Sequence, residues 1–391
     1  MQLTFDAHVE AFRADFVAFL DEHLPSEADA LERSRSSSHI PEWARNWQRL
    51  MFDNGWLLPG YPPEFGGRNA TLLQQYVHQQ ELARRRAYLT FNPQGVGIIS
   101  ASLISFGTPE QQRRWAVPIL RAEMTASLGM SEPAAGSDLA SLRTRAVRDG
   151  DDFVVNGQKV WTSGAHDADV LLTFVRTDPN APKHKGISAL MIPTDLPGVV
   201  RRPFASACDQ DDLDFNEVFL SDVRVPADNL VGPLNEGWRV ANGSLGHERN
   251  MLWLSYADRL QELVEDFRPH TVLDRDRYAT LVMDNQALRL LGSMALARAA
   301  HGDEDVAALS MLKLFGSEAS QMATEHALAA AAVDALAHPS FSGPYSAHHL
   351  DLYRSGWFER YVRTFGGTIA GGTSEIQRNI IAQRVLGLPR N

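Results

Sequence analysis

The chain has 391 residues, of which 44% are hydrophobic and 22% are charged, a composition typical of a folded protein with two or three domains. A net charge of −11 and an isoelectric point near 5.6 argue against a nucleic-acid partner, because phosphate binding needs clustered lysines and arginines. Cys208 is the only cysteine, so no intramolecular disulfide can form and a reducing compartment is expected.

The sequence predicts a cytoplasmic protein without a membrane segment. Residues 1–10 lack the basic start and apolar run of a signal peptide, and no stretch approaches about 18 uninterrupted apolar residues. The predicted helices are mixed or acidic, whereas helices that lie on membranes carry a basic face.

Residues 1–120 are predicted to form a helical domain. Large apolar side chains recur at helical spacing in residues 9–20 and again in residues 43–51. Thr108 and Gln111 have the spacing of a capping box, which predicts the start of a helix that continues to about residue 120.

Residues 121–235 are predicted to form a small β-sandwich or barrel. The dipeptide Asn156-Gly157 accepts positive φ angles, so we expect it to be the turn of a hairpin. Further strands are predicted at residues 170–176, 187–192 and 217–225.

Residues 236–391 are predicted to form a C-terminal four-helix bundle. Segments rich in Ala, Leu and Met predict its helices around residues 238–267, 276–300, 304–336 and 348–364. The fold class is therefore a multidomain α+β protein, in the order helices, sheet, helices.

A glycine-rich segment covers residues 366–379. Glycines allow a ligand to approach the backbone, and Ser374 with Gln377 has capping-box spacing, so free N–H groups could face an anion or a polar ring edge. A flexible turn before a last helix explains the composition equally well. The segment lacks the ending of a Walker A loop and opens no βαβ unit.

Residues 130–138 (Met-Ser-Glu-Pro-Ala-Ala-Gly-Ser-Asp) stand at the junction of two predicted domains. Such junctions often hold cofactors, although the same residue types also form plain turns. Together with Trp161 and Ser163, the segment could form an aromatic wall with hydroxyl donors.

Glu248 interrupts the apolar stripe of a predicted helix, between Leu245 and Leu252. Desolvation at that position would raise the pKa of its carboxyl group, as a general base needs. A structural ion pair with Arg249 or another basic group is the alternative. No metal site is predicted, because His247 and the pair His348-His349 have no ligand spacing. No nucleophile motif is present either.

Five segments resemble the acyl-CoA dehydrogenase family, in the same order and along nearly the whole chain. They are Gly55–Gly67, Ser131–Asp138, Asn156–Trp161, Val223–Gly232 and Gly372–Asn379. The resemblance implies an N-terminal helical domain, a central β domain and a C-terminal bundle, with FAD between subunits and an acyl-CoA substrate.

The resemblance also implies roles for individual residues. Flavin contacts would come from Met130, Ser131, Trp161 and Ser163, contacts to the phosphates or adenosine from Thr373 and Gln377, and substrate contacts from Gly136, Ser137, Arg249 and Gly371. In much of the family the catalytic glutamate occupies the position of Gly371. Isovaleryl-type enzymes carry it on a helix instead, at the position of Glu248. The implied reaction passes the α proton to this base and the β hydride to flavin N5, and yields a 2-enoyl-CoA.

Some features resemble one branch of the family more than others. An Arg-x-x-Phe-Gly segment is not found between residues 268 and 288, nor a Gln-x-x-Gly-Gly element near 338–346. Residues 176–180 and 183–186 resemble actinobacterial relatives in sterol side-chain breakdown, some of which form mixed α and β tetramers. We therefore expect a homo-oligomer or an α/β hetero-oligomer, a branched or ring-bearing acyl-CoA, and electron-transfer flavoprotein or a similar acceptor.

Two other functions remain compatible with the same fold, because a fold does not determine its chemistry. One is a flavin monooxygenase or nitroalkane oxidase, and the other is a non-catalytic partner subunit or a nucleic-acid-binding relative. Glu248 at the base position argues against the monooxygenase and the inactive subunit, and the acidic charge argues against DNA binding.

Overall fold

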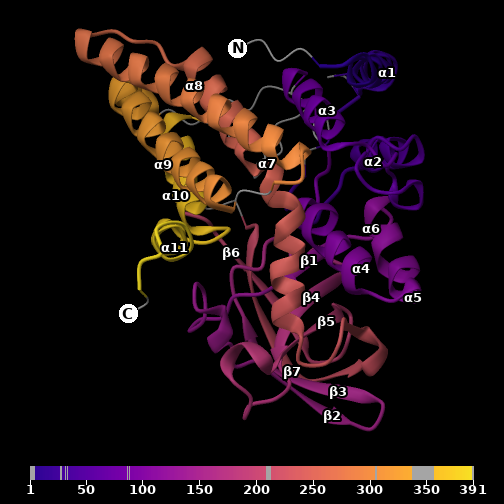
Figure 1. Ribbon diagram of the computed structural model, residues 1–391. Helices are drawn as coiled ribbons and strands as arrows, with labels where there is room; N and C mark the ends of the chain where they lie inside the picture. Colours follow the sequence, from indigo (N-terminus) through magenta and orange to yellow (C-terminus); the bar gives the residue numbers. More distant parts are fainter. Residues whose placement is uncertain are drawn as a thin grey trace.

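The computed structural model runs from a helical region through one sheet to a bundle of long helices (Figure 1). It describes residues 5–26, 29–30, 32, 34–85, 87, 89–207, 213–303, 306–336 and 356–389. Cys208, the His348-His349 pair and the segment near 338–346 lie outside the described residues.

The N-terminal region is helical, as predicted. Its helices are α1 (Ala7–His23), α2 (Glu42–Asp53), η1 (Pro63–Phe65), α3 (Leu72–Arg84), η2 (Gln94–Ile99), α4 (Ser100–Phe106), α5 (Pro109–Gln111), η3 (Gln112–Ala116) and α6 (Val117–Leu120). The capping box is confirmed, since Thr108 Oγ1 accepts from the N–H of Gln111 at 3.2 Å and Gln111 Oε1 accepts from the N–H of Thr108 at 3.1 Å.

The central region is one eight-stranded sheet in the order β6-β7-β3-β2-β4-β5-β8, with β1 beside β4. Its strands are β1 (Ala126–Gly129), β2 (Arg145–Asp149), β3 (Asp152–Lys159), β4 (Val170–Arg176), β5 (Ile187–Pro193), β6 (Val199–Phe204), β7 (Phe215–Pro226) and β8 (Leu230–Val231). Successive residues of β4 and β5 belong to two different apolar clusters, so both faces of these strands are buried. The predicted strands at 170–176, 187–192 and 217–225 match β4, β5 and β7.

The predicted hairpin turn at Asn156-Gly157 is wrong. Strand β3 continues through this dipeptide, and the turn lies between β2 and β3, where Gly150 has a φ of 62°. Asn156-Gly157 instead marks an irregularity in the pairing of β3 with β7. A Cβ atom on Gly157 would lie 2.4 Å from Thr144 Oγ1, so the glycine is needed for a close approach within the sheet.

The C-terminal region is a bundle of four long helices followed by a short one. These are α7 (Gly237–Asp266), α8 (Val272–Ala300), α9 (Val306–Ala331), α10 (Trp357–Ile369) and α11 (Ser374–Ile380). Two short segments follow helices of this region, η7 (Ala332–Leu336) and η8 (Ile381–Val385). Three others lie between strands of the sheet, η4 (Leu139–Ser141), η5 (Lys183–Lys185) and η6 (Ala227–Asn229). Gly366 and Gly367, which the sequence groups with a glycine-rich loop, lie inside α10. Only residues 370–373 form the loop.

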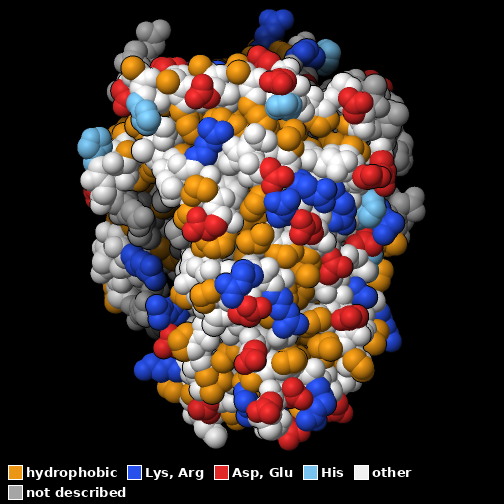
Figure 2. Space-filling view, turned by 90° about the vertical axis from the view of Figure 1, so that its right-hand side faces the viewer, with side chains coloured by type: hydrophobic (Ala, Val, Ile, Leu, Met, Phe, Trp, Pro, Cys, Tyr) orange, Lys and Arg blue, Asp and Glu red, His pale blue; other side chains and the backbone are white. Residues whose placement is uncertain are grey.

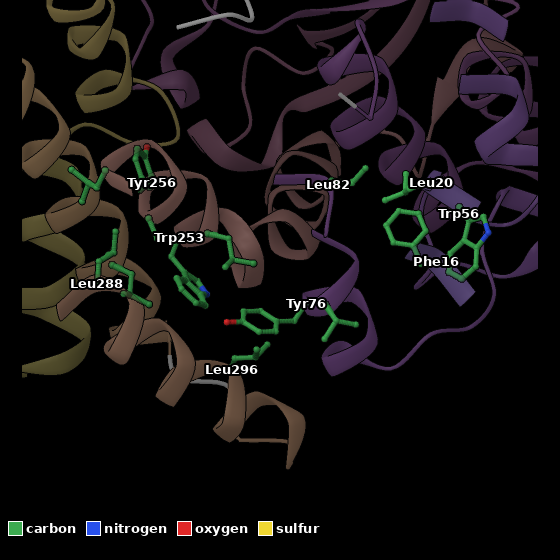
Figure 3. Packing of buried hydrophobic residues seen from close by; sticks show 14 of the residues in the cluster. Phe16, Leu20, Trp56, Tyr76, Leu82, Trp253, Tyr256, Leu288 and Leu296 are labelled. Atoms are coloured by element: carbon green, nitrogen blue, oxygen red, sulfur yellow. The ribbon is translucent and has the colours of Figure 1, made fainter. Parts of the chain in front are cut away.

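The N-terminal helices and the bundle share one apolar core (Figure 3). Tyr76 of α3 stacks on Trp253 of α7, with ring centroids 6.2 Å apart, and Leu296 of α8 lies beside this pair. The first turns of α7 belong to a different cluster, in which Val240 and Ala241 pack with residues of β4 and β5. Helix α7 therefore joins the bundle to the sheet.

The surface over the N-terminal helices carries acidic and basic side chains interspersed among apolar ones (Figure 2). Among the described residues, no helix is long and apolar enough to cross a membrane. Within the same residues, no three His, Cys, Asp or Glu side chains are grouped so that they could hold a metal ion.

The contact between α7 and α8 depends on a glycine. A Cβ atom at Gly292 would lie 2.2 Å from the indole of Trp253, so we expect Gly292→Ala to reduce the free energy of unfolding by about 1–3 kcal/mol. Urea denaturation followed by circular dichroism measures this loss. The matched control is Gly366→Ala in α10, where nothing lies within 4 Å. Alanine has a better helix propensity than glycine, so this control variant should be as stable as the wild type or more stable by up to about 1 kcal/mol. A Gly292→Ala protein as stable as the wild type contradicts the packing argument.

Candidate functional site

Four of the residues expected to contact flavin come together just after strands β1 and β3. Met130 and Ser131 follow β1, and Trp161 and Ser163 follow β3. The N–H of Val160 donates to the carbonyl of Ser131 at 3.0 Å, which places the two segments side by side. The hydroxyl of Ser127 in β1 also donates to the carbonyl of Ser163.

Trp161 is held in an unusual conformation. Its φ is 62°, in the left-handed region that bulky residues avoid, and 59% of the residue is exposed. Phe204 and Phe215 contact the indole edge-on, with ring centroids 5.2 and 5.5 Å away. A large flat ring is thus exposed while two other rings hold it in place.

A buried polar network supports the Trp161–Ser163 segment from behind. The N–H of Gly164 donates to the carbonyl of Asp214 at 2.7 Å, and the Asp214 carboxylate accepts from the N–H and the hydroxyl of Ser37 at 2.7 and 2.8 Å. Gly164 has a φ of 65°, and a Cβ atom there would lie 2.6 Å from the backbone nitrogen of Ser38. A loop of the N-terminal region therefore fixes this segment against the start of β7.

A buried ion pair holds the Met130–Ser131 segment. Lys159 Nζ lies 2.8 Å from Glu132 Oε1 and 3.2 Å from the carbonyl oxygen of Met130, and both charged side chains are almost fully buried. Glu132 also accepts from the N–H groups of Arg143 and Thr144 at 2.6 and 2.9 Å. The pair thus joins three stretches of backbone.

Burial and charge both act on this pair. Burial lowers the pKa of the Lys159 ammonium to about 8, although the Glu132 carboxylate opposes the shift. Burial raises the pKa of Glu132, but the Lys159 charge and the hydrogen bonds outweigh it, so the pKa lies below its usual value. Both groups are therefore charged at neutral pH.

Gly136 and Ser137 directly follow a turn that runs from Glu132 to Ala135. Glu132 and Ala135 exchange two backbone hydrogen bonds, at 2.9 and 3.0 Å, which close the turn. A Cβ atom on Gly136 would meet nothing within 4 Å, so the backbone faces open space at this point. The turn therefore brings two expected substrate contacts next to the expected flavin contacts.

The loop between α10 and α11 forms a second group, with Gly371, Thr373 and Gln377. Thr373 caps α11 by accepting from the N–H of Ile376 at 3.2 Å, so the capping box expected at Ser374 is wrong by one residue. Gln377 Nε2 donates to the carbonyl of Gly371 at 3.0 Å. The carbonyl groups of this loop accept hydrogen bonds from side chains of α9 and α11.

Glu248 and Arg249 both lie in α7, and their side chains fall outside the described residues. Glu248 comes about two turns after Ala241, which is 4% exposed, and about two turns before Ser255, which is exposed. Its Cα therefore lies on a face of α7 that is buried before it and open after it.

The residues after β1 and β3 fit the flavin that the resemblance implies. An exposed indole can lie against a planar ring system, and the half-buried hydroxyl groups of Ser131 and Ser163 can donate to ring nitrogens or carbonyls. In the same segment, Thr162 Oγ1 is buried without a hydrogen-bond partner.

Sequence reasoning missed the two buried lysines. The lysines of the chain are Lys159, Lys183, Lys185 and Lys313. Those at 183 and 185 are exposed, whereas Lys159 and Lys313 are 1% and 6% exposed. Each interrupts an otherwise largely apolar or strand-like run, and a charged residue in such a run is the signal that could have identified them.

Removing one member of the buried pair leaves a buried charge alone. We expect Lys159→Met to cost about 3–5 kcal/mol of the free energy of unfolding, because Glu132 is left buried without its partner. Urea denaturation at pH 7 measures this change. Lys159→Met combined with Glu132→Gln should unfold at higher urea than the single variant.

Exposed Lys185→Met provides the control and should stay within about 0.5 kcal/mol of the wild type. If the Lys159→Met protein has wild-type stability, the pair does not hold the segment as argued.

Three family models together match nearly the whole chain. The acyl-CoA dehydrogenase N-terminal domain matches residues 6–123, the middle domain residues 127–223, and the C-terminal domain residues 235–386.

Individual proteins match over similar lengths. Acyl-CoA dehydrogenases IpdE1 and FadE29 of Mycobacterium tuberculosis are each 36% identical, covering 98% and 94% of this chain and 98% and 93% of their own. The solved "Tcur3481-Tcur3483 steroid ACAD" has a TM-score of 0.82, and the ChsE4-ChsE5 complex from M. tuberculosis has a TM-score of 0.77. Both are 30% identical over 100% of either chain. The chain therefore belongs to the acyl-CoA dehydrogenase family.

Proposed function

We propose that this acyl-CoA dehydrogenase converts an acyl-CoA to the 2-enoyl-CoA with Glu248 as the base that removes the α proton. Members of the family are FAD-dependent flavoproteins. When bound, FAD supplies the hydride acceptor at N5. Met130, Ser131, Trp161 and Ser163 would hold the flavin, with Thr373 and Gln377 toward its phosphates or adenosine.

The observation that carries the proposal is the course of α7. The helix is continuous through residue 248, and Ala241, two turns before Glu248 on the same face, is buried, whereas Ser255, two turns after it, is exposed. A carboxyl group between these positions would be partly desolvated, which raises its pKa toward the range of a general base, and would still be open to a substrate. Gly371, at the other position where the family carries a base, has no side chain.

The other residues of the proposed site would bind and orient the thioester. The loop containing Gly371 would offer backbone N–H groups to the thioester carbonyl, which makes the α proton more acidic. Gly136 and Ser137 would contact the substrate beside the flavin contacts, and Arg249 would support the same site from α7.

The substrate class is proposed from the relatives. The "Tcur3481-Tcur3483 steroid ACAD" names steroid substrates, and that structure and ChsE4-ChsE5 are named for two chains each. We therefore propose a branched or ring-bearing acyl-CoA and an assembly of like or unlike chains. Exposed apolar side chains on α8 supply a surface for such an assembly, among them Met283, Leu290 and Met294.

One prediction of the proposed function concerns FAD and substrate. The protein, purified alone and together with a co-expressed related chain, should carry non-covalent FAD whose absorbance bleaches on addition of acyl-CoA. The value of kcat/KM should be at least about tenfold higher for a steroid side-chain thioester than for butyryl-CoA, because a larger apolar group buries more surface. Native mass spectrometry of the same samples gives the assembly. A protein that takes up no FAD in either preparation contradicts the function, and a preference for butyryl-CoA contradicts the substrate class.

The second prediction concerns the base. Glu248→Gln keeps the size of the side chain but cannot accept a proton, so the rate constant of flavin reduction should fall by about 10²- to 10⁴-fold. FAD content and acyl-CoA affinity should stay near wild type, which places the effect in kcat. Exposed Glu265→Gln in the same helix is the control and should react normally. Wild-type flavin reduction in Glu248→Gln would show that another group is the base.

A further inference from the structure

The loop of residues 370–373 is held by two side chains that act on consecutive carbonyl groups. Lys313 of α9 donates from Nζ to the carbonyl oxygen of Gly372 at 2.7 Å. Gln377 of α11 donates from Nε2 to the carbonyl oxygen of Gly371 at 3.0 Å. Two adjacent peptide units are therefore fixed from the protein side.

Fixing a carbonyl also fixes an N–H group. In a trans peptide the C=O and the N–H of one unit point in opposite directions. The N–H of Gly372 is therefore turned away from Gln377, and the N–H of Thr373 is turned away from Lys313. Both glycines have positive φ angles, 68° and 94°, which allow this orientation.

Lys313 is used for the loop rather than for a carboxylate. The carboxylates nearest to it electrostatically are Glu318 and Glu375, and Arg378 pairs with both, at 2.5 and 3.9 Å. Burial lowers the pKa of the Lys313 ammonium, and these two carboxylates oppose the shift. A lysine that is 6% exposed and directed at a glycine carbonyl is costly to bury, so its contact with the loop needs a reason.

We propose that Lys313 is a positioning residue, which orients the 370–373 loop so that its backbone N–H groups receive the carbonyl oxygen of a CoA thioester. This inference rests on the proposed function. Gly371 lacks a side chain, so the loop can act only through its backbone there, and the carbonyl of the next residue, Gly372, is the group that Lys313 holds. Lys313 itself touches no substrate.

The test compares two ligands that differ at one oxygen. The first is a 3-thiaacyl-CoA, which binds as a thioester but has no β hydride to give, and the second is the S-alkyl thioether of CoA with the same chain and no carbonyl. Wild-type holoenzyme should bind the thioester at least about tenfold more tightly than the thioether. In Lys313→Met the thioester affinity should fall by about tenfold while the thioether affinity stays the same. Lys313→Arg keeps a charged donor and should restore much of the difference.

Several outcomes overturn the proposal. If Lys313→Met weakens both ligands equally, the lysine has only a structural role, and if it weakens neither, the tether is not needed. Lys185→Met, at an exposed position, is the control and should bind both ligands as the wild type does. Failure of the proposed function can be told apart from failure of the Lys313 proposal. In that case the wild-type protein itself would show no flavin bleaching with any acyl-CoA.

Discussion

The structure depends on helix α7, which is buried against two different parts of the protein. The 30 residues of α7 span about 45 Å. Its first turn lies so close to β5 that a Cβ atom on Gly237 would be 2.6 Å from the backbone of Ser188. Its later turns place Trp253 in the core shared by the N-terminal helices and the bundle. A rigid helix held at both ends fixes the position of Glu248 more closely than a loop would.

The flavin side of the site is supported by polar contacts instead. Lys159 and Glu132 are buried charges, and Asp214 is a buried acceptor for Ser37. Burying charged groups is costly unless every partner is present, so these contacts specify one arrangement of the backbone more than they add stability. Apolar packing thus holds the helix that carries Glu248, the proposed base, and buried polar networks hold the segments that would receive the flavin. Lys313 is likewise a buried charge, and it contacts the backbone of the 370–373 loop.

The sequence predicted well those features that depend on neighbouring residues. The capping box at Thr108 and the bounds of β4 follow from local patterns, and the structure has both. The prediction at Asn156-Gly157 failed because a partner outside the local pattern decides the structure, since Gly157 is needed for contact with Thr144. The prediction at Gly366 failed for a local reason, since this glycine continues α10 although glycine is typical of turns.

The candidate site was predicted unevenly for a similar reason. The flavin contacts follow short motifs, and the structure brings Met130, Ser131, Trp161 and Ser163 together. Lys313 belongs to no such motif, and Lys159 was assigned no role although it lies in the Asn156–Trp161 segment, because the role of each lysine comes from the backbone carbonyl that it reaches. The role of Glu248 was inferred from helical periodicity and resemblance together.

Proton transfer at the α carbon tests the central claim without involving the redox step. Holoenzyme is incubated in D₂O with a 3-thiaacyl-CoA, and deuterium at the α carbon is measured by mass spectrometry. The account predicts exchange by the wild type, and exchange slower by about 10²-fold or more in Glu248→Gln at the same ligand occupancy. Equal exchange by the two proteins would contradict the assignment of Glu248 as the base.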